Sequence, residues 1–259
     1  MESENWVMDN FGHDPWARNS MIETAENVAR EAGLTREQAD ETTLRRYEQY
    51  LAALEGDRDF QKRYMFPVEI RISKNKTVLV ETDEGIMPTS REGLAALKPV
   101  VPGGIHTFGS QTHPADGNCA VVVTSREKAA ELSVDASVEI RVVSYGFSRA
   151  KKGFMAMAVV PAVKMALDKA GIGVADLKAI KTHNPFVTND LYMARELGID
   201  VMGFNNYGCS LIFGHPQAPT AGRLIIEGIE EVAKLGGGYL LWGGCAAGDT
   251  AAAMVIRVG

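Results

Sequence analysis

The sequence predicts an α/β fold in which helices cover a mixed β-sheet. Residues 138–259 alternate between short apolar runs and amphipathic stretches, in the order β-α-β-α-β-α-β-β. Two of the amphipathic stretches end at Gly171 and Gly198, and glycine is the residue that most often follows the end of a helix. Polar loops follow several apolar runs, so a site is expected where the strands end.

The sequence changes character near Gly103, before which long apolar runs are few. In the second half, strands are expected at 138–143, 177–182, 201–204, 239–242 and 251–258. Helices are expected at 161–170, 188–197 and 220–235. The continuous core is therefore expected to lie in this half of the chain.

The amino-terminal region is expected to be an excursion of short elements rather than a compact domain. We expect a polar arm at 1–20, helices at 20–32, 35–54 and 91–97, and two paired strands within 66–80. The second helix opens with a capping-box pattern, Thr35 to Gln38. Later, the apolar run 118–123 is typical of a strand buried on both faces, and a helix at 125–132 follows it.

Composition limits the class of protein. The chain has 259 residues, which suggests one or two domains, and its 46% hydrophobic and 23% charged content is that of a soluble globular protein. The net charge of −6 argues against a nucleic-acid binder. Three cysteines are too few for a disulfide framework or a zinc site, so a reducing cytoplasm is expected. The sequence predicts no membrane span and no signal peptide.

Two loops carry the strongest candidates for chemistry. Gly214-His215-Pro216 can hold a histidine at a sharp bend, because proline restricts φ and glycine tolerates unusual backbone angles. About thirty residues later, Cys245 lies among small residues directly after an apolar run. An imidazole near a thiol can exchange protons with it. The alternatives are an ordinary loop for His215 and a small buried hydrophobe for Cys245.

Weaker candidates lie in three other places. Asn184, in Thr182-His183-Asn184-Pro185-Phe186, carries an amide that could polarise a carbonyl oxygen, although Asn-Pro is also a common turn. Cys209 could compete as the reactive thiol, but its neighbours suit a packed turn. Cys119 is expected to be structural. The polar loop 110–117 is expected to contact a ligand, and within it His113 fits a solvent or a site role equally well.

These residues resemble the thiolase family over nearly the whole chain. The resemblance is carried by Gly214-His215-Pro216 before a helix, by Cys245 with Gly248, and by His183-Asn184-Pro185-Phe186. It is also carried by Thr24-Ala25-Glu26-Asn27-Val28-Ala29 and by Asp116-Gly117 before an apolar strand. The resemblance implies a five-layer αβαβα thiolase-like fold. Its expected parts are an arm and loop domain at 1–102, a strand and helix completing the first half-domain at 103–137, and the second half-domain at 138–259.

The resemblance also implies a role for each matched residue. His215 would belong to an oxyanion hole for the thioester oxygen and help to activate a nucleophilic thiol. Asn184, with a water, would complete that oxyanion hole. Cys245 would be the acid and base for the substrate α-carbon or the leaving thiol. Substrate contacts are expected from Met21, Thr112, His183 and Phe186. Coenzyme A thioesters would be substrates, with no permanently bound cofactor and no metal.

The sequence departs from the family pattern in one important respect. Thiolases carry an acylated cysteine in an amino-terminal half, and none of the three cysteines here has that context. We therefore expect a split thiolase in which a partner subunit supplies that cysteine, as a heterotetramer by analogy. The alternative is a degenerate thiolase-like protein that binds acyl-CoA or scaffolds a complex without turnover. A third possibility is an unrelated thiol enzyme that uses Cys209 with His215. Alanines at 218 and 221 and Ile22 stand where the family usually has glycine.

Overall fold

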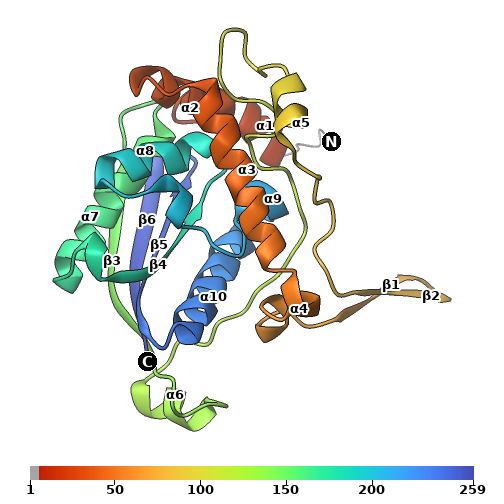
Figure 1. The fold of residues 1–259 in the computed structure, drawn as a ribbon, viewed down its shortest axis with the longest axis vertical. Coiled ribbons are helices and arrows are strands. Elements are labelled where there is room, and N and C mark those ends of the chain that lie inside the picture. The colour runs from red at the N-terminus through yellow and green to blue at the C-terminus, as the bar shows by residue number, and fades with distance from the viewer. Residues whose placement is uncertain (1–5) are drawn as a thin grey trace.

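A four-stranded mixed sheet organises the second half of the chain in the computed structural model, which describes residues 6–259 (Figure 1). Its strands are β3 (Ile140–Arg149), β4 (Leu177–His183), β5 (Gly238–Ala246) and β6 (Thr250–Val258), in the order β3-β6-β5-β4. β4 and β5 are parallel, whereas β6 is antiparallel to both of its neighbours. The predicted α/β class is confirmed.

Helices cover both faces of this sheet because successive side chains of a strand point to opposite sides. Leu241 of β5 packs toward α7 (Val159–Ala170) and α8 (Val187–Leu197), whereas Leu240 packs toward α10 (Ala218–Lys234). Gly146 of β3 lies so close to α7 that a Cβ there would overlap the carbonyl oxygen of Ala162. The sheet and α7 are therefore in close backbone contact.

The amino-terminal region contributes helices that lie above and beside the sheet domain (Figure 1). They are α1 (Trp6–Gly12), α2 (Met21–Glu31), α3 (Arg36–Ala52), α4 (Glu55–Arg58) and α5 (Arg91–Ala96); α6 (Arg126–Leu132) and α9 (Ser210–Phe213) come later in the chain. The predicted capping box of α3 is confirmed, since Thr35 and Gln38 bond each other reciprocally at 3.0 and 3.3 Å.

A β-hairpin projects from the body of the molecule (Figure 1). It consists of β1 (Val68–Ser73) and β2 (Lys76–Val80), which pair in antiparallel fashion as the sequence predicts. Short 3-10 helices occupy Gln61–Arg63, Met155–Ala158, Val174–Asp176 and Val201–Gly203.

The prediction of a strand at 201–204 is wrong. Val201–Gly203 forms a 3-10 turn because the carbonyl of its first residue and that of the residue after the turn converge on one buried cation. The guanidinium of Arg46 donates to the carbonyl of Val201 at 2.8 Å and to that of Phe204 at 2.9 Å. An extended strand alternates the direction of its carbonyls and could not aim both at one side chain.

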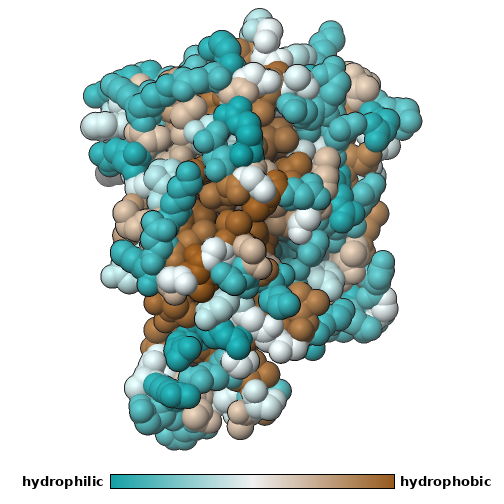
Figure 2. Space-filling model, turned by 60° about the vertical axis from the view of Figure 1, so that its left-hand side comes forward, coloured by the Kyte–Doolittle hydropathy of each residue, from teal (hydrophilic) through white to brown (hydrophobic). Residues whose placement is uncertain are grey.

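The apolar run at 118–123 does not form a strand within the described chain. Val121, Val122 and Val123 are 53%, 76% and 82% exposed instead of buried. On β3, Ile140, Val142, Tyr145 and Phe147 are also exposed. Figure 2 brings the β3 side of Figure 1 forward and shows a broad hydrophobic area above the protruding knob that contains α6. This much exposed apolar surface is unusual for a protein without a partner.

We expect Gly146→Ala to lower the free energy of unfolding by about 1–3 kcal/mol, because the new methyl group overlaps the backbone of α7. Gly173→Ala is the matched control, since its nearest neighbour would be a flexible carboxylate oxygen of Asp176 at 3.8 Å. Urea denaturation of both variants measures the difference. Equal midpoints would contradict the close packing of β3 on α7.

Candidate active site

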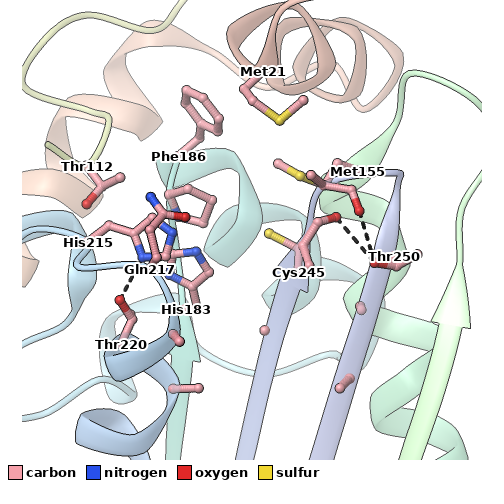
Figure 3. A pocket seen from close by; sticks show the side chains of 18 of the residues that line it. Met21, Thr112, Met155, His183, Phe186, His215, Gln217, Thr220, Cys245 and Thr250 are labelled. Carbon is pink, nitrogen blue, oxygen red and sulfur yellow. Dashed lines mark hydrogen bonds between the residues drawn. The ribbon is translucent and has the colours of Figure 1, made fainter. Parts of the chain in front are cut away.

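A cavity of about 930 Å³ opens where β4 and β5 end, next to the first turn of α10 (Figure 3). Its lining is mostly apolar. The apolar lining residues include Phe11, Met21, Ile22, Met155, Phe186 and Trp242. Polar groups enter from the loop 111–113, from two histidines and from Cys245. Figure 3 shows His183, His215 and Gln217 on one side and Cys245 with Thr250 on the other.

His215 is held by the corner that the sequence singled out. Gly214 before it has φ +89°, a left-handed backbone that glycine adopts without strain. The His215 amide donates to the carbonyl of His113 at 2.8 Å, and the Nδ1 atom lies 2.6 Å from the hydroxyl of Thr220 in α10. With Nδ1 engaged, Nε2 is the nitrogen left for a ligand.

His183 is the last residue of β4 and stacks on His215, with ring centroids 4.2 Å apart. Its Nδ1 atom lies 2.9 Å from the hydroxyl of Ser210, so a hydroxyl group orients this imidazole, as the hydroxyl of Thr220 orients His215. In each ring, Nε2 is therefore the nitrogen that no side chain in the described part of the chain engages. The sequence predicted His183 only as a substrate contact.

Both histidines are neutral at physiological pH. Burial lowers the pKa of His215 to about 4. Burial, reinforced by the neighbouring His215, lowers the pKa of His183 well below its ordinary value. A neutral imidazole can carry one hydrogen on Nε2 and donate it to a developing negative charge.

Cys245 lies on β5, one residue beyond Gly244, which is the register partner of His183. Its Sγ accepts a hydrogen bond from the Asn189 amide at 3.2 Å. Burial raises the pKa of the thiol to about 12, and the Asn189 hydrogen bond opposes that rise. Cys245 is therefore a protonated thiol at rest.

Asn184 does not line the cavity, and its assignment to the oxyanion hole is not supported by its position. Its amide nitrogen donates to Asp190 at 2.7 Å and contacts Cys209 Sγ at 3.1 Å. Its oxygen accepts from Ser210 at 3.0 Å and from the Leu211 amide at 3.1 Å. The side chain is buried and has no group left for a substrate.

Strand alternation explains why His183 and not Asn184 faces the cavity. Thr182 and Asn184 both bond Asp190, so the two flanking side chains point to the same buried network. His183 between them must point the other way. The period-two rule predicts from the sequence that His183 and Asn184 face opposite ways, and the contact with Asp190 decides which of the two faces the cavity.

Most of the other candidate residues from the sequence line the cavity, whereas Cys209 lies in the core. Met21, Thr112 and Phe186 all line the cavity, as expected, and His113 lines it too. Burial lowers the pKa of His113, and its Nε2 atom has no partner within residues 6–259. Cys209 is fully buried in the core, and burial raises its pKa to about 11.

Gln217 is one of the polar cavity residues that sequence reasoning missed, as are Thr220 and Thr250. Gln217 has φ +60° and ψ −116°, angles that residues other than glycine rarely adopt. The only signal in the sequence is its place two residues after His215. Within residues 6–259, no helix has the length and apolar character needed to cross a membrane, and no group of three or more acidic, histidine or cysteine residues could hold a metal ion.

Comparison with family models covers most of the chain. A model described as "Thiolase, N-terminal domain" matches residues 7–127, and one described as "Thiolase, C-terminal domain" matches residues 136–258. The chain belongs to the thiolase superfamily. The two matches do not test the predicted division at 102 and 137, which stays a prediction.

Known thiolases are similar to this chain in sequence and in structure. A beta-ketothiolase of Cupriavidus necator is 30% identical over 250 residues, 95% of this chain and 62% of the relative. The crystal structure of the Bacillus anthracis acetyl-CoA acetyltransferase matches with TM-score 0.90 and 27% identity, covering 100% of this chain and 65% of that one. Human mitochondrial 3-ketoacyl-CoA thiolase in complex with CoA matches with TM-score 0.84 and 27% identity, over 98% and 62% of the two chains. The chain thus spans less than two thirds of these thiolases.

The lowered histidine pKa values predict how stability depends on pH. The unfolded chain binds a proton on His215 near pH 6.5, whereas the folded chain binds it only near pH 4. The unfolded state therefore gains protons first as the pH falls, and the free energy of unfolding decreases from pH 7 toward pH 4. We expect His215→Asn to weaken this decrease, as measured by urea midpoints at pH 7 and pH 5. His13→Asn, at an exposed position, is the control. Equal pH dependence in the two variants would count against a buried neutral His215.

Proposed function

We propose that this chain is one subunit of a thiolase-type acyltransferase that acts on coenzyme A thioesters. The proposed reaction is reversible condensation or thiolysis of 3-ketoacyl-CoA. The observation that carries the proposal is the neutral histidine pair, oriented through hydroxyl groups, across a cavity from a buried protonated thiol. This combination supplies both a hydrogen-bond donor for an oxyanion and a proton donor for a leaving group.

His215 is the proposed oxyanion donor, and His183 is the proposed proton acceptor. When Thr220 donates its hydroxyl hydrogen to Nδ1 of His215, the Nε2 atom of that ring carries the hydrogen and faces the ligand space. Ser210 gives its one hydroxyl hydrogen to the Asn184 oxygen, so Nδ1 of His183 donates to Ser210 and its Nε2 atom is left as a proton acceptor. His183 thus faces the cavity in place of Asn184, as a proton acceptor rather than an oxyanion donor.

Cys245 is the proposed acid and base. In the first half-reaction, a thiol of the partner passes its proton to Nε2 of His183 and attacks the thioester carbonyl. The carbon–sulfur bond to coenzyme A breaks, and the leaving thiolate takes the proton of Cys245. In the second half-reaction, the Cys245 thiolate removes the α-proton of another thioester, and the resulting carbanion attacks the acyl group on the partner. The partner's thiolate then recovers its proton from Nε2 of His183.

The described cysteines support a nucleophile from elsewhere. Cys209 is fully buried and already contacts the Asn184 amide. Cys119 lies outside the cavity, with its sulfur 3.4 Å from the carbonyl oxygen of Pro219. With Cys245 assigned to proton transfer, none of the three is placed to take the acyl group. The proposed partner is a half-thiolase subunit with a reactive cysteine, and two copies of each chain would form the assembly.

The exposed apolar surfaces support the same partner. The run 121–123 and the exposed side of β3 together present the apolar area that a second sheet domain would cover. Residues 118–123 also leave their backbone groups free to pair with another strand. An acyl-CoA-binding protein without turnover is the second candidate, because the pKa values of Cys209 and Cys245 are both raised and neither thiol is activated.

We expect His215→Ala to lower kcat/KM of the assembled enzyme about 10²–10³-fold, the usual effect of removing one oxyanion donor. Thioester consumption is the measurement, and His13→Ala is the control at an exposed position. Near-normal turnover of the variant would exclude the assigned role. Acyl-CoA binding by the wild-type assembly with no turnover would favour the second candidate.

We expect native mass spectrometry of the protein from its own cells to detect a stoichiometric partner with an alkylatable cysteine. Val122→Asp should abolish that association, because it places a charge in the proposed apolar contact. Val134→Asp is the matched control, since Val134 is a fully exposed valine outside the run. A homo-oligomer without another chain, or unchanged association of Val122→Asp, would refute the split assembly.

A further inference from the structure

Three buried side chains form a line of hydrogen bonds behind the cavity wall. The Glu26 carboxylate lies 2.9 Å from Nδ1 of His106, and Nε2 of His106 lies 2.7 Å from the hydroxyl of Thr188. His106 and Thr188 have no exposed surface, and Glu26 is 4% exposed. Each member comes from a different part of the chain: α2, the loop before Thr107, and the first turn of α8.

The carboxylate of Glu26 is also bonded to the loop backbone. It accepts from the amide of Ile105 at 3.0 Å and from that of His106 at 2.9 Å. Gly104 allows this approach, because a Cβ at that position would overlap the carboxylate. Burial opposes ionisation of Glu26, but the hydrogen bonds from His106 and Ile105 outweigh it and lower the pKa of the carboxyl group. Glu26 therefore remains an anion that fixes the loop to α2.

The same loop is joined to α8 at the edge of the cavity. The Val187 amide donates to the carbonyl of Ser110 at 3.0 Å, and the Thr112 amide donates to that of Pro185 at 2.7 Å. The His106 ring also meets Phe186 edge-on, with centroids 5.6 Å apart. The hydrogen-bonded line thus contacts Phe186 of the cavity lining, and Thr112 is joined to the residue before Phe186 through the carbonyl of Pro185.

A hydroxyl, an imidazole and a carboxylate in this order also form the arrangement of a nucleophile, a base and an orienting acid. None of the three lines the cavity, and Thr188 has no exposed surface that a thioester could reach. A nucleophilic role is therefore excluded by access. The remaining role is to hold three cavity-forming elements at fixed distances.

We propose that Glu26, His106 and Thr188 form a positioning relay that aligns Met21, Thr112 and Phe186 for thioester binding. The proposal rests on the proposed function for its substrate. An imidazole suits the relay because its two nitrogens bond partners on opposite sides of one ring. An aliphatic residue at 106 would fill the space but would connect neither α2 nor α8.

The test is Thr188→Val in the protein assembled with its partner, because valine keeps the shape and removes the hydroxyl. The lost bond leaves Nε2 of His106 unpaired, so we expect KM for the acyl-CoA to rise about tenfold while kcat stays within about twofold. We also expect faster amide hydrogen exchange in segment 105–113. Thr188→Ser, which restores the hydroxyl, should recover both values.

Thr43→Val is the matched control, because Thr43 is equally buried and its hydroxyl makes no hydrogen bond within residues 6–259. Unchanged exchange and KM in Thr188→Val would overturn the relay, as would an equal loss in Thr43→Val. If Thr188→Val fails to assemble, Glu26→Gln should show the same rise in KM and in exchange. If the wild-type assembly has no turnover, the proposed function fails, but acyl-CoA binding and hydrogen exchange still decide the relay.

Discussion

The buried ion pair between Arg46 and Asp190 is the constraint on which the site depends. Both side chains are fully buried, with Nε of Arg46 2.8 Å from the carboxylate. Asp190 also accepts from Thr182 and Asn184 at the end of β4, and Arg46 binds the turn after residue 200. Removal of one member of such a pair costs about 3–5 kcal/mol, because a buried charge is left without compensation. The pair therefore joins α3, α8 and the end of β4, the strand that presents His183.

The electrostatics of the cavity follow from burial rather than from nearby charges. His215 loses its positive charge because desolvation disfavours the protonated ring, and Cys245 keeps its proton for the corresponding reason. The resting site is thus neutral and largely apolar. In the proposed reaction, charge that develops on the thioester would meet the oriented imidazole of His215 in a medium where hydrogen bonds are strong.

The molecule combines buried polar networks behind the cavity with apolar surfaces that lack a cover. Polar groups behind the cavity are paired in networks, such as the line from Glu26 through His106 to Thr188. The valines at 121–123 and the outer side chains of β3 have no comparable partner. A protein gains most by covering exposed apolar area of this kind. The burial of apolar area that stabilises the fold of the chain is therefore also the proposed reason for its assembly with a partner.

The sequence by itself determined the helices, most strands and the location of the site. Periodicity, the capping box of α3 and the glycine after α7 depend on local geometry, so they could be predicted from the sequence alone. The Gly-His-Pro corner and the loop of Cys245 could be predicted for the same reason. Only the tertiary structure decided that residues 201–203 form a turn that binds Arg46. It also decided that the side-chain amide of Asn184 is hydrogen-bonded to Asp190 and therefore does not face the cavity. The first outcome depends on a partner more than a hundred residues away in the chain. The second depends on which face of β4 meets a buried charge. No short stretch of sequence contains that information.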